Sequence, residues 1–184
     1  MSEEALVRNC APTLAGLKTG SLFVCAFDSR RQLARELRDA NRILTPKGLR
    51  LVPLRCREGR VLLYLYRPVR LKADLSEAEA QALLQEAGYP VRGIGNYLAE
   101  LARRLRSFNE FPHEIGLFLG YPPEDVKGFM VHKGKNSKCS GCWKVYGDAD
   151  KAQRTFAAFR HCTDCYCKRH AMGATVEQLA VKGV

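Results

Sequence analysis

The architecture is set by residues 21–66, SLFVCAFDSRRQLARELRDANRILTPKGLRLVPLRCREGRVLLYLY. The first seven residues (21–27) are apolar apart from Ser21 and include aromatic and β-branched side chains, which is typical of a central strand buried on both faces. From 29 to 44, apolar side chains recur at helical spacing with five arginines on the other faces. This pattern predicts an amphipathic helix that covers a sheet, and TPKG (45–48) ends it.

Two apolar segments, 49–54 and 61–66, flank REGR (57–60), in which glycine supplies the positive φ of a tight turn. They predict a β-hairpin, and Pro53 places its first arm at a sheet edge or a bulge. Strand, helix and hairpin together predict the α+β class. We expect a single domain with a small, mostly antiparallel sheet and helices packed on it.

Further helices are predicted from start and stop signals along the rest of the chain. They are a helix over 10–20 with Pro12 in its first turn, one opened by a capping box at 76–79 and ended at Gly88, one over 96–108 with Phe108 facing inward, one that begins at Asp148, and one opened by a capping box at 175–178.

The length of 184 residues fits one domain, 1–184, whose C-terminal subregion 132–170 is rich in Cys and His. The longest uninterrupted apolar runs are six residues, against roughly 20 for a membrane span, so we expect no membrane partner. The N-terminal MSEEALVRNC (1–10) carries acids where a signal peptide carries basic residues. We therefore expect a cytoplasmic protein, whose eight cysteines are free thiols, metal ligands or redox groups rather than disulfides.

Positive charge is concentrated in residues 30–72. This segment has thirteen Lys or Arg and three Asp or Glu, and so supplies +10 of the net charge of +11. A basic patch attracts nucleic acid, an anionic cofactor or an acidic partner such as an acidic redox protein. The alternative is a solvated arginine face, because the segment lacks the aromatic interleaving of single-strand binders.

The cysteine spacing predicts a metal site. Two Cys-x-x-Cys pairs, Cys139 with Cys142 and Cys162 with Cys165, are separated by nineteen residues. Each pair chelates from one turn and four thiolates complete a tetrahedron, so zinc is the default metal, and an iron–sulfur cluster uses the same ligands. The second pair lies at the end of a predicted helix, unlike a zinc ribbon. Unlinked cysteines and a redox pair remain the alternatives.

A second candidate pair is Cys10 with His113, in the order of a thiol nucleophile and its base. At the start of the predicted helix over 10–20, Cys10 would have a lowered pKa. The alternatives are a buried inert thiol and a polar residue in a first helical turn. Glu114 orients His113 only if these chain neighbours converge.

A third candidate is the loop HKGKNSK (132–138), which is rich in cations and contains no acid. Backbone amides and ammonium groups of such a loop can bind a phosphate or another anionic cofactor. The cations are His132, Lys133, Lys135 and Lys138. A solvated loop is the alternative, because the spacing does not match a P-loop.

Five long motifs resemble an uncharacterised bacterial family, domain of unknown function 3793. They are CAPTLAGLKTGSLF (10–23), LTPKGLR (44–50), GRVLLYLYRP (59–68), FPHEIGLFLGYPPEDVKGF (111–129) and KCSGCWKVYGD (138–148). The resemblance covers nearly the whole chain. It implies a single-domain cytosolic protein of mostly anaerobic bacteria and no established activity.

The resemblance also bears on the thiols. The family pattern has Cys at the positions of Cys10, Cys139 and Cys162, but commonly Tyr at Cys142 and no fixed Cys at Cys165. It implies that a four-thiolate site is peculiar to this chain or absent. The pattern also has His at the position before Cys10, where this chain has Asn, so a Cys–His pair there is lost.

Three hypotheses on function follow from the sequence. The first is a metal-binding (zinc or iron–sulfur) or redox-responsive thiol protein. The second is a thiol enzyme that uses Cys10 and His113. The third is a protein whose basic segment 30–72 binds nucleic acid or an acidic partner.

Overall fold

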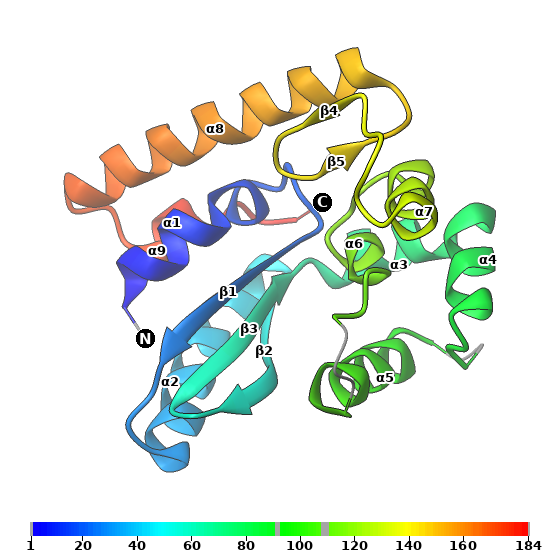
Figure 1. Ribbon diagram of the computed structural model, residues 1–184. Coiled ribbons are helices and arrows are strands. Elements are labelled where there is room, and N and C mark those ends of the chain that lie inside the picture. The colour runs from blue at the N-terminus through cyan, green and yellow to red at the C-terminus, as the bar shows by residue number, and fades with distance from the viewer. Residues whose placement is uncertain (1, 91–92, 108–110, 184) are drawn as a thin grey trace. The chain divides into compact units, whose positions relative to one another are not determined.

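A computed structural model describes residues 2–90, 93–107 and 111–183 of the chain. They form an α+β structure with a three-stranded antiparallel sheet, a two-stranded antiparallel sheet and helices (Figure 1). This confirms the predicted fold class. The chain divides into two compact units: unit 1 comprises Met1–Val69 and Phe159–Val184, and unit 2 comprises Arg70–Ala158. That the whole chain folds cooperatively as one domain stays a prediction.

The elements of unit 1 include the three-stranded sheet. They are α1 (Glu3–Leu14), β1 (Gly20–Ala26), α2 (Arg30–Leu44), the 3-10 helix η1 (Thr45–Lys47), β2 (Arg50–Arg57), β3 (Arg60–Tyr66), the end of α8 (Ala149–Ala171) and α9 (Val176–Leu179).

The strand order is β1-β3-β2, with both pairs antiparallel. The predicted hairpin is therefore confirmed, and the register of β2 shifts between Pro53 and Arg55, as expected of a bulge. The prediction of a central first strand is wrong. β1 is an edge strand and Val24 is 47% exposed, because β3, with Leu63 fully buried, takes the central place. Apolar runs of similar length do not reveal which strand lies in the middle.

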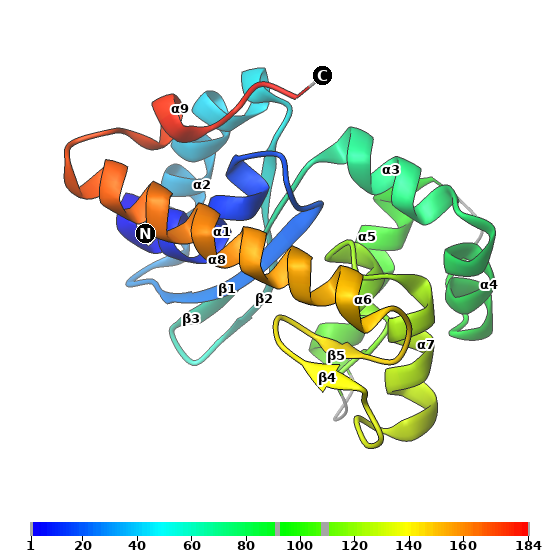
Figure 2. The same cartoon turned by 90° about the horizontal axis from the view of Figure 1, so that it is seen from above.

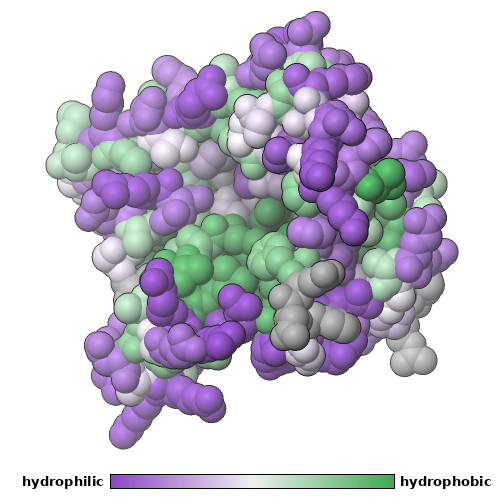
Figure 3. Space-filling view, in the orientation of Figure 1, coloured by the Kyte–Doolittle hydropathy of each residue, from purple (hydrophilic) through white to green (hydrophobic). Residues whose placement is uncertain are grey.

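One face of this sheet packs on α1 and α2. Phe23, Leu63 and Leu65 of the sheet share a core cluster with Leu14 of α1 and Leu33 of α2. On the other face, Tyr64 and Tyr66 stack with ring centroids 4.9 Å apart. Figure 3 shows hydrophobic side chains gathered over this second face.

Helix α2 confirms the amphipathic prediction for 29–44. The Ser29 hydroxyl accepts a hydrogen bond from the backbone N–H of Gln32 and so caps the helix. At the other end, Gly48 adopts φ 75°, the left-handed conformation that suits glycine after a helix.

Helix α1 corrects the helix predicted over 10–20. It begins at Glu3, behind the capping residue Ser2, and two acids occupy its first turn. Pro12 lies near its end rather than at its start, where it removes only one helical N–H donor. Cys10 is thus inside the helix and not at its positive N-terminus.

The end of α1 is held by Arg67, a buried cation. Its guanidinium donates to the carbonyl oxygens of Thr13 (2.8 Å), Leu14 (2.7 Å) and Val181 (2.8 Å). The last carbonyl oxygens of a helix have no hydrogen-bond donor within the helix, and the Arg67 guanidinium donates to two of them. Figures 1 and 2 both place α9 beside α1, where the Val176 N–H donates to the Glu3 carboxylate at 3.2 Å.

Unit 2 is mainly helical and includes the small second sheet. Its elements are α3 (Pro68–Ser76), which begins at the end of unit 1, α4 (Ala78–Glu86), α5 (Ile94–Ser107), α6 (Ile115–Phe118), α7 (Pro123–His132), β4 (Cys139–Ser140), β5 (Lys144–Val145) and the start of α8.

Several predicted helix boundaries are confirmed in the two units. Helix α5 matches the segment 96–108, although Phe108 lies outside the described residues. The Asp148 carboxylate accepts from the Lys151 N–H at the start of α8. The capping box at Thr175 is present.

The capping box predicted at 76–79 is wrong. Ser76 is the last residue of α3, and its hydroxyl donates to the Lys72 carbonyl oxygen at 2.6 Å. Glu77 precedes α4 without a capping hydrogen bond. The predicted end is right, because Gly88 has φ 76° just after that helix. Within the described ranges, every helix is too short or too polar to traverse a bilayer.

Candidate functional site

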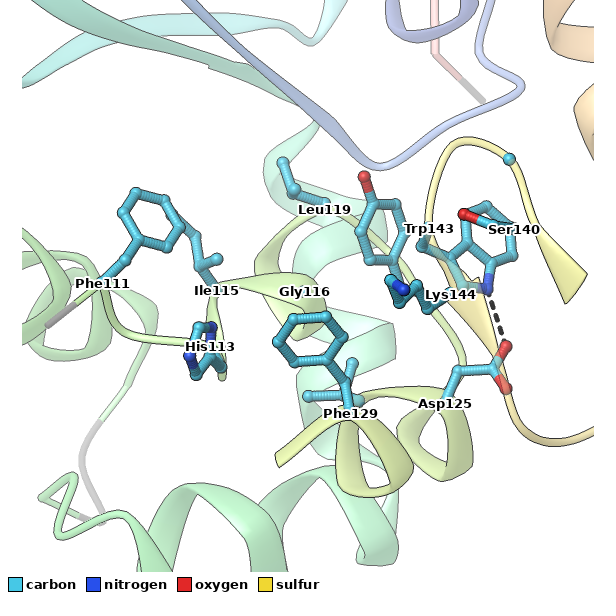
Figure 4. Close-up of a pocket in the computed structure, with 13 residues that line it drawn as sticks. Phe111, His113, Ile115, Gly116, Leu119, Asp125, Phe129, Ser140, Trp143 and Lys144 are labelled. Carbon is cyan, nitrogen blue, oxygen red and sulfur yellow. Dashed lines mark hydrogen bonds between the residues drawn. The ribbon is translucent and has the colours of Figure 1, made fainter. Parts of the chain in front are cut away.

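Unit 2 contains a largely apolar pocket of about 460 Å³ (Figure 4). Its wall comes from the 111–129 segment, which includes α6 and most of α7, and from the β4–β5 hairpin. Aromatic rings contribute much of the lining: Phe111, Tyr121, Phe129 and Trp143. Pockets of this size and composition are the usual sites of small-molecule binding.

Trp143 is the best-fixed ring of the wall. It stacks on Tyr121 with ring centroids 4.7 Å apart, and it forms an edge-to-face pair with Phe156, with centroids 4.5 Å apart and an interplanar angle of 80°. Both geometries are favoured for aromatic pairs. Burial raises the pKa of Tyr121 to about 12, so this phenol is neutral at physiological pH.

Asp125 ties α7 to the β4–β5 hairpin. Its carboxylate accepts from Trp143 Nε1 at 2.7 Å and from the backbone N–H groups of Tyr146 (2.6 Å) and Gly147 (2.8 Å). The residue is 3% exposed. Charge-assisted hydrogen bonds of this kind fix both partners. Asp125, the one acid among the described residues that line the pocket, is therefore engaged in holding the tryptophan in place.

Two close glycine contacts bring the hairpin and the helices together. A Cβ on Gly128 of α7 would lie 2.3 Å from Tyr146 Cγ. A Cβ on Gly141 would lie 2.2 Å from Phe156 Cδ2. Glycine at these positions lets each ring lie directly on the backbone.

Lys144 lies in the pocket wall and is half-buried. Its side chain makes no hydrogen bond or ion pair with any other residue in the described part of the chain. In Figure 4 its amine lies among the rings of the pocket rather than beside the Asp125 carboxylate. The pocket therefore presents an ammonium group whose charge the described residues leave unmatched.

His113 lies at the exposed edge of the same pocket, with its ring centroid 4.8 Å from that of Phe129. Glu114, its neighbour, points elsewhere: its carboxylate accepts from Tyr89 Oη at 3.0 Å and from Arg104 Nη1 at 3.3 Å. The structure thus gives Glu114 a role in an internal ion cluster rather than as a partner of the imidazole.

This ion cluster continues into α5. The Glu100 carboxylate accepts from both Arg103 (2.7 and 2.8 Å) and Arg104 (2.7 Å). The two guanidinium groups lower the pKa of Glu100 from 4.5 to about 2. The Arg104 guanidinium also lies 4.3 Å from the centroid of the Tyr89 ring. These contacts fix the helix that precedes the pocket segment.

Cys10 lies in the core of unit 1 and is fully buried. Burial raises the pKa of its thiol well above the ordinary value, which corrects the lowered pKa predicted from sequence. The physical reason is its place inside α1, among apolar side chains and away from the helix N-terminus. His113 belongs to unit 2. A joint catalytic role of the two residues stays a prediction.

The four cysteines of the predicted metal site fall in two units. Cys139 and Cys142 lie in and beside the hairpin of unit 2, and Cys162 and Cys165 lie on the part of α8 that belongs to unit 1. Among residues 2–90, 93–107 and 111–183, no group of three or more His, Cys, Asp or Glu is placed to hold a metal. Binding of zinc or an iron–sulfur cluster by the four thiolates stays a prediction.

Two of the three thiols on α8, those of Cys162 and Cys165, are close neighbours one helical turn apart. Burial, and to a lesser extent the charge of Cys165, raises the pKa of Cys162 to about 11. Cys165 Sγ lies 3.6 Å from His161 Nε2, one turn away on the same helix. A dithiol with an adjacent imidazole is therefore present on one side of α8.

Two of the four cations of the 132–138 loop, His132 and Lys138, make contacts with neighbouring residues. The His132 ring stacks against Tyr146 at 5.5 Å. The Lys138 ammonium donates to the Gly147 carbonyl oxygen at 2.7 Å, and the Lys135 carbonyl oxygen accepts from Tyr146 Oη. Lys133 ends α7 in a left-handed conformation. Anion binding by this loop stays a prediction.

The basic segment 30–72 places its charge mainly on exposed surface. All five arginines of α2 are exposed: Arg30, Arg31, Arg35, Arg38 and Arg42. Such a surface fits both sequence interpretations, a solvated face and a docking face for an acidic partner.

Fold and site together define an α+β protein with a small antiparallel sheet and a separate aromatic pocket. The chain belongs to the family described as protein of unknown function (DUF3793), whose model matches residues 6–180. The family resemblance read from the five motifs is therefore confirmed. No curated protein and no solved structure matches the chain.

The pocket was not among the sites predicted from the sequence, although His113 and the 132–138 loop next to it were candidates. The density of Pro, Gly and aromatic residues between 111 and 148 is the signal that was available. It did not single out Phe129, Lys144 or Asp125, because their roles depend on how α7 meets the hairpin.

Proposed function

We propose that the protein binds a small organic molecule with a planar ring in the aromatic pocket of unit 2. The observation that carries the proposal is the fixed aromatic wall, in which Trp143 is held by Asp125 and stacked on Tyr121. Preorganised rings bind a planar ligand without a cost for ordering them. The volume of about 460 Å³ suits one or two fused rings.

Trp143 is the only tryptophan of the chain and so reports on this pocket alone. The experiment titrates the protein with the neutral aromatic probe N-phenyl-1-naphthylamine. We expect the probe to become fluorescent and the Trp143 emission to fall by energy transfer, saturating at one probe per chain.

A pocket-filling variant makes the test specific. Ser140 is exposed and lines the pocket, so Ser140→Phe places a ring in the space the probe needs. Ser107→Phe makes the same change at an exposed position of α5 that does not line it. Loss of binding in Ser140→Phe and not in Ser107→Phe supports the proposal. A wild-type protein that leaves the probe dark contradicts it.

A second candidate is a metal-binding or redox-responsive role of the thiols. It is favoured by the contact between Cys165 and His161 and by the neighbouring Cys162. All eight cysteines are free, which also suits the cytoplasmic location that we propose. Zinc titration of the reduced protein tests it: Cys162→Ser should abolish tight binding and Cys56→Ser, at an exposed site, should not.

The other two sequence hypotheses remain proposals with their own tests. A thiol enzyme requires Cys10 to alkylate faster than a free cysteine near neutral pH. Binding of nucleic acid or an acidic protein by the arginines of α2 requires retention on DNA or an anionic resin that falls steeply with salt.

A further inference from the structure

The charge of the aromatic pocket restricts what it can bind. Among the described residues, the titratable groups that line it are His113, Tyr121, Asp125 and Lys144, and burial keeps the Tyr121 phenol neutral by raising its pKa to about 12. Asp125 is buried, and three N–H donors already use its carboxylate. Its two oxygens are therefore engaged by protein donors, so the side-chain groups that can still pair with an anionic ligand are the imidazole and the ammonium group.

Lys144 is the group that a ligand would meet. Its side chain is half removed from water and has no acid partner among the described residues. An ammonium without a counter-charge attracts the anionic group of a ligand, and the attraction is stronger beside apolar rings than in open water. Since the amine lies among the rings (Figure 4), the anion and the ring of one ligand reach their partners together.

We propose that the ligand is an aromatic anion, that is, a planar ring with a carboxylate or phosphate group that pairs with Lys144. This inference rests on the proposed small-molecule function. The ring packs against Trp143 and Phe129, and the anionic group accepts from the ammonium. Exposed His113 lies at the mouth of the pocket as a second donor. Lysine binds carboxylate and phosphate alike as a point charge. The structure therefore indicates a ligand with a negative charge and a planar ring, and the experiment distinguishes which anionic group the ligand has.

Two probes of nearly the same shape separate the charge from the ring. 8-Anilinonaphthalene-1-sulfonate is an anion, and N-phenyl-1-naphthylamine is the neutral compound without the sulfonate. For each probe, the dissociation constant is measured from the quenching of Trp143 at low salt. Competition with 1-naphthoate and with 1-naphthyl phosphate then shows which anionic group the pocket prefers.

The decisive variant is Lys144→Met, which keeps the length and apolar stem of the side chain. We expect it to weaken binding of the anionic probe roughly tenfold, the effect of one charge-assisted contact, and to change binding of the neutral probe less than about twofold. Lys144→Arg retains the charge and should retain most of the affinity for the anion. Lys127→Met is the matched control, because Lys127 is exposed on α7 and does not line the pocket.

The outcomes separate this inference from the proposed function. If neither probe quenches Trp143, both fail. If the neutral probe binds and Lys144→Met leaves the anionic probe unchanged, the inference fails and the small-molecule function stands. A loss with Lys144→Met equal to that with Lys127→Met also overturns it, because the probe then responds only to the net charge of the protein.

Discussion

Asp125→Asn is predicted to destabilise the protein because it replaces the hydrogen bond to Trp143 with two donors that face each other. In the wild type, one carboxylate oxygen of Asp125 accepts from the Tyr146 and Gly147 N–H groups and the other accepts from Trp143 Nε1. Asparagine keeps a single acceptor oxygen. With that oxygen toward the two backbone donors, its NH₂ group faces the indole N–H of Trp143, donor against donor.

The magnitude follows from the contacts that change. A hydrogen bond to a charged group contributes about 1.5–3 kcal/mol, and a buried donor left without an acceptor costs about 1–3 kcal/mol. Removing a buried charge offsets part of this loss. We expect the free energy of unfolding to fall by about 2–4 kcal/mol.

Urea unfolding followed by Trp143 fluorescence measures the effect. Asp150→Asn is the control, because Asp150 is an exposed acid in the first turn of α8, and it should cost less than about 1 kcal/mol. A double-mutant cycle with Trp143→Phe, followed by circular dichroism, isolates the pair. The reasoning is refuted if Asp125→Asn unfolds within about 0.5 kcal/mol of the wild type.

Three further predictions concern acid stability, packing and thiol reactivity. Arginine partners hold the pKa of Glu100 at about 2 instead of 4.5, so the carboxylate stabilises the fold fully above pH 4.5 and this contribution is lost as the pH falls toward 2. In urea unfolding at a series of acidic pH values, Glu100→Gln should therefore lose less stability over that range than the wild type, and an unchanged profile would contradict this. Gly128→Ala should lower the free energy of unfolding by about 1–3 kcal/mol through overpacking against Tyr146. Gly95→Ala, which has open space around it in α5, should raise it by up to about 1 kcal/mol. Equal melting temperatures of the two variants would contradict the close contact between Gly128 and Tyr146. In the native protein Cys56, which is exposed, should alkylate much faster at pH 7 than Cys162, whose raised pKa and burial leave little thiolate; peptide mapping after timed iodoacetamide labelling checks the order.

The local pattern of the chain was sufficient for the β-α-β-β part of the fold. Helix α2 and the β2–β3 hairpin follow from helical spacing, apolar segments and turn residues that are all close in sequence. The position of β1 at the sheet edge was not predictable in this way, because it depends on which strand pairs on both sides. Helix α1 begins earlier than predicted, because Ser2 and the two acids that follow it start the helix and Pro12 does not.

The site was predictable only as a region. Spacing between cysteines suggested a metal centre, but spacing carries no information on where α8 and the hairpin lie. The pocket depends on three contacts between segments: Asp125 with Trp143, Tyr121 with Trp143, and Gly128 with Tyr146. None of them has a periodic signature in the sequence.

The central claim is that Trp143 forms the wall of a pocket that binds a planar ring. The single tryptophan gives one indole N–H cross-peak in a ¹⁵N–¹H correlation spectrum. On titration with N-phenyl-1-naphthylamine, this cross-peak should shift through the ring current of the bound probe and saturate at one equivalent. If the probe binds and the indole cross-peak does not move, the ligand lies elsewhere and the account of the pocket is wrong.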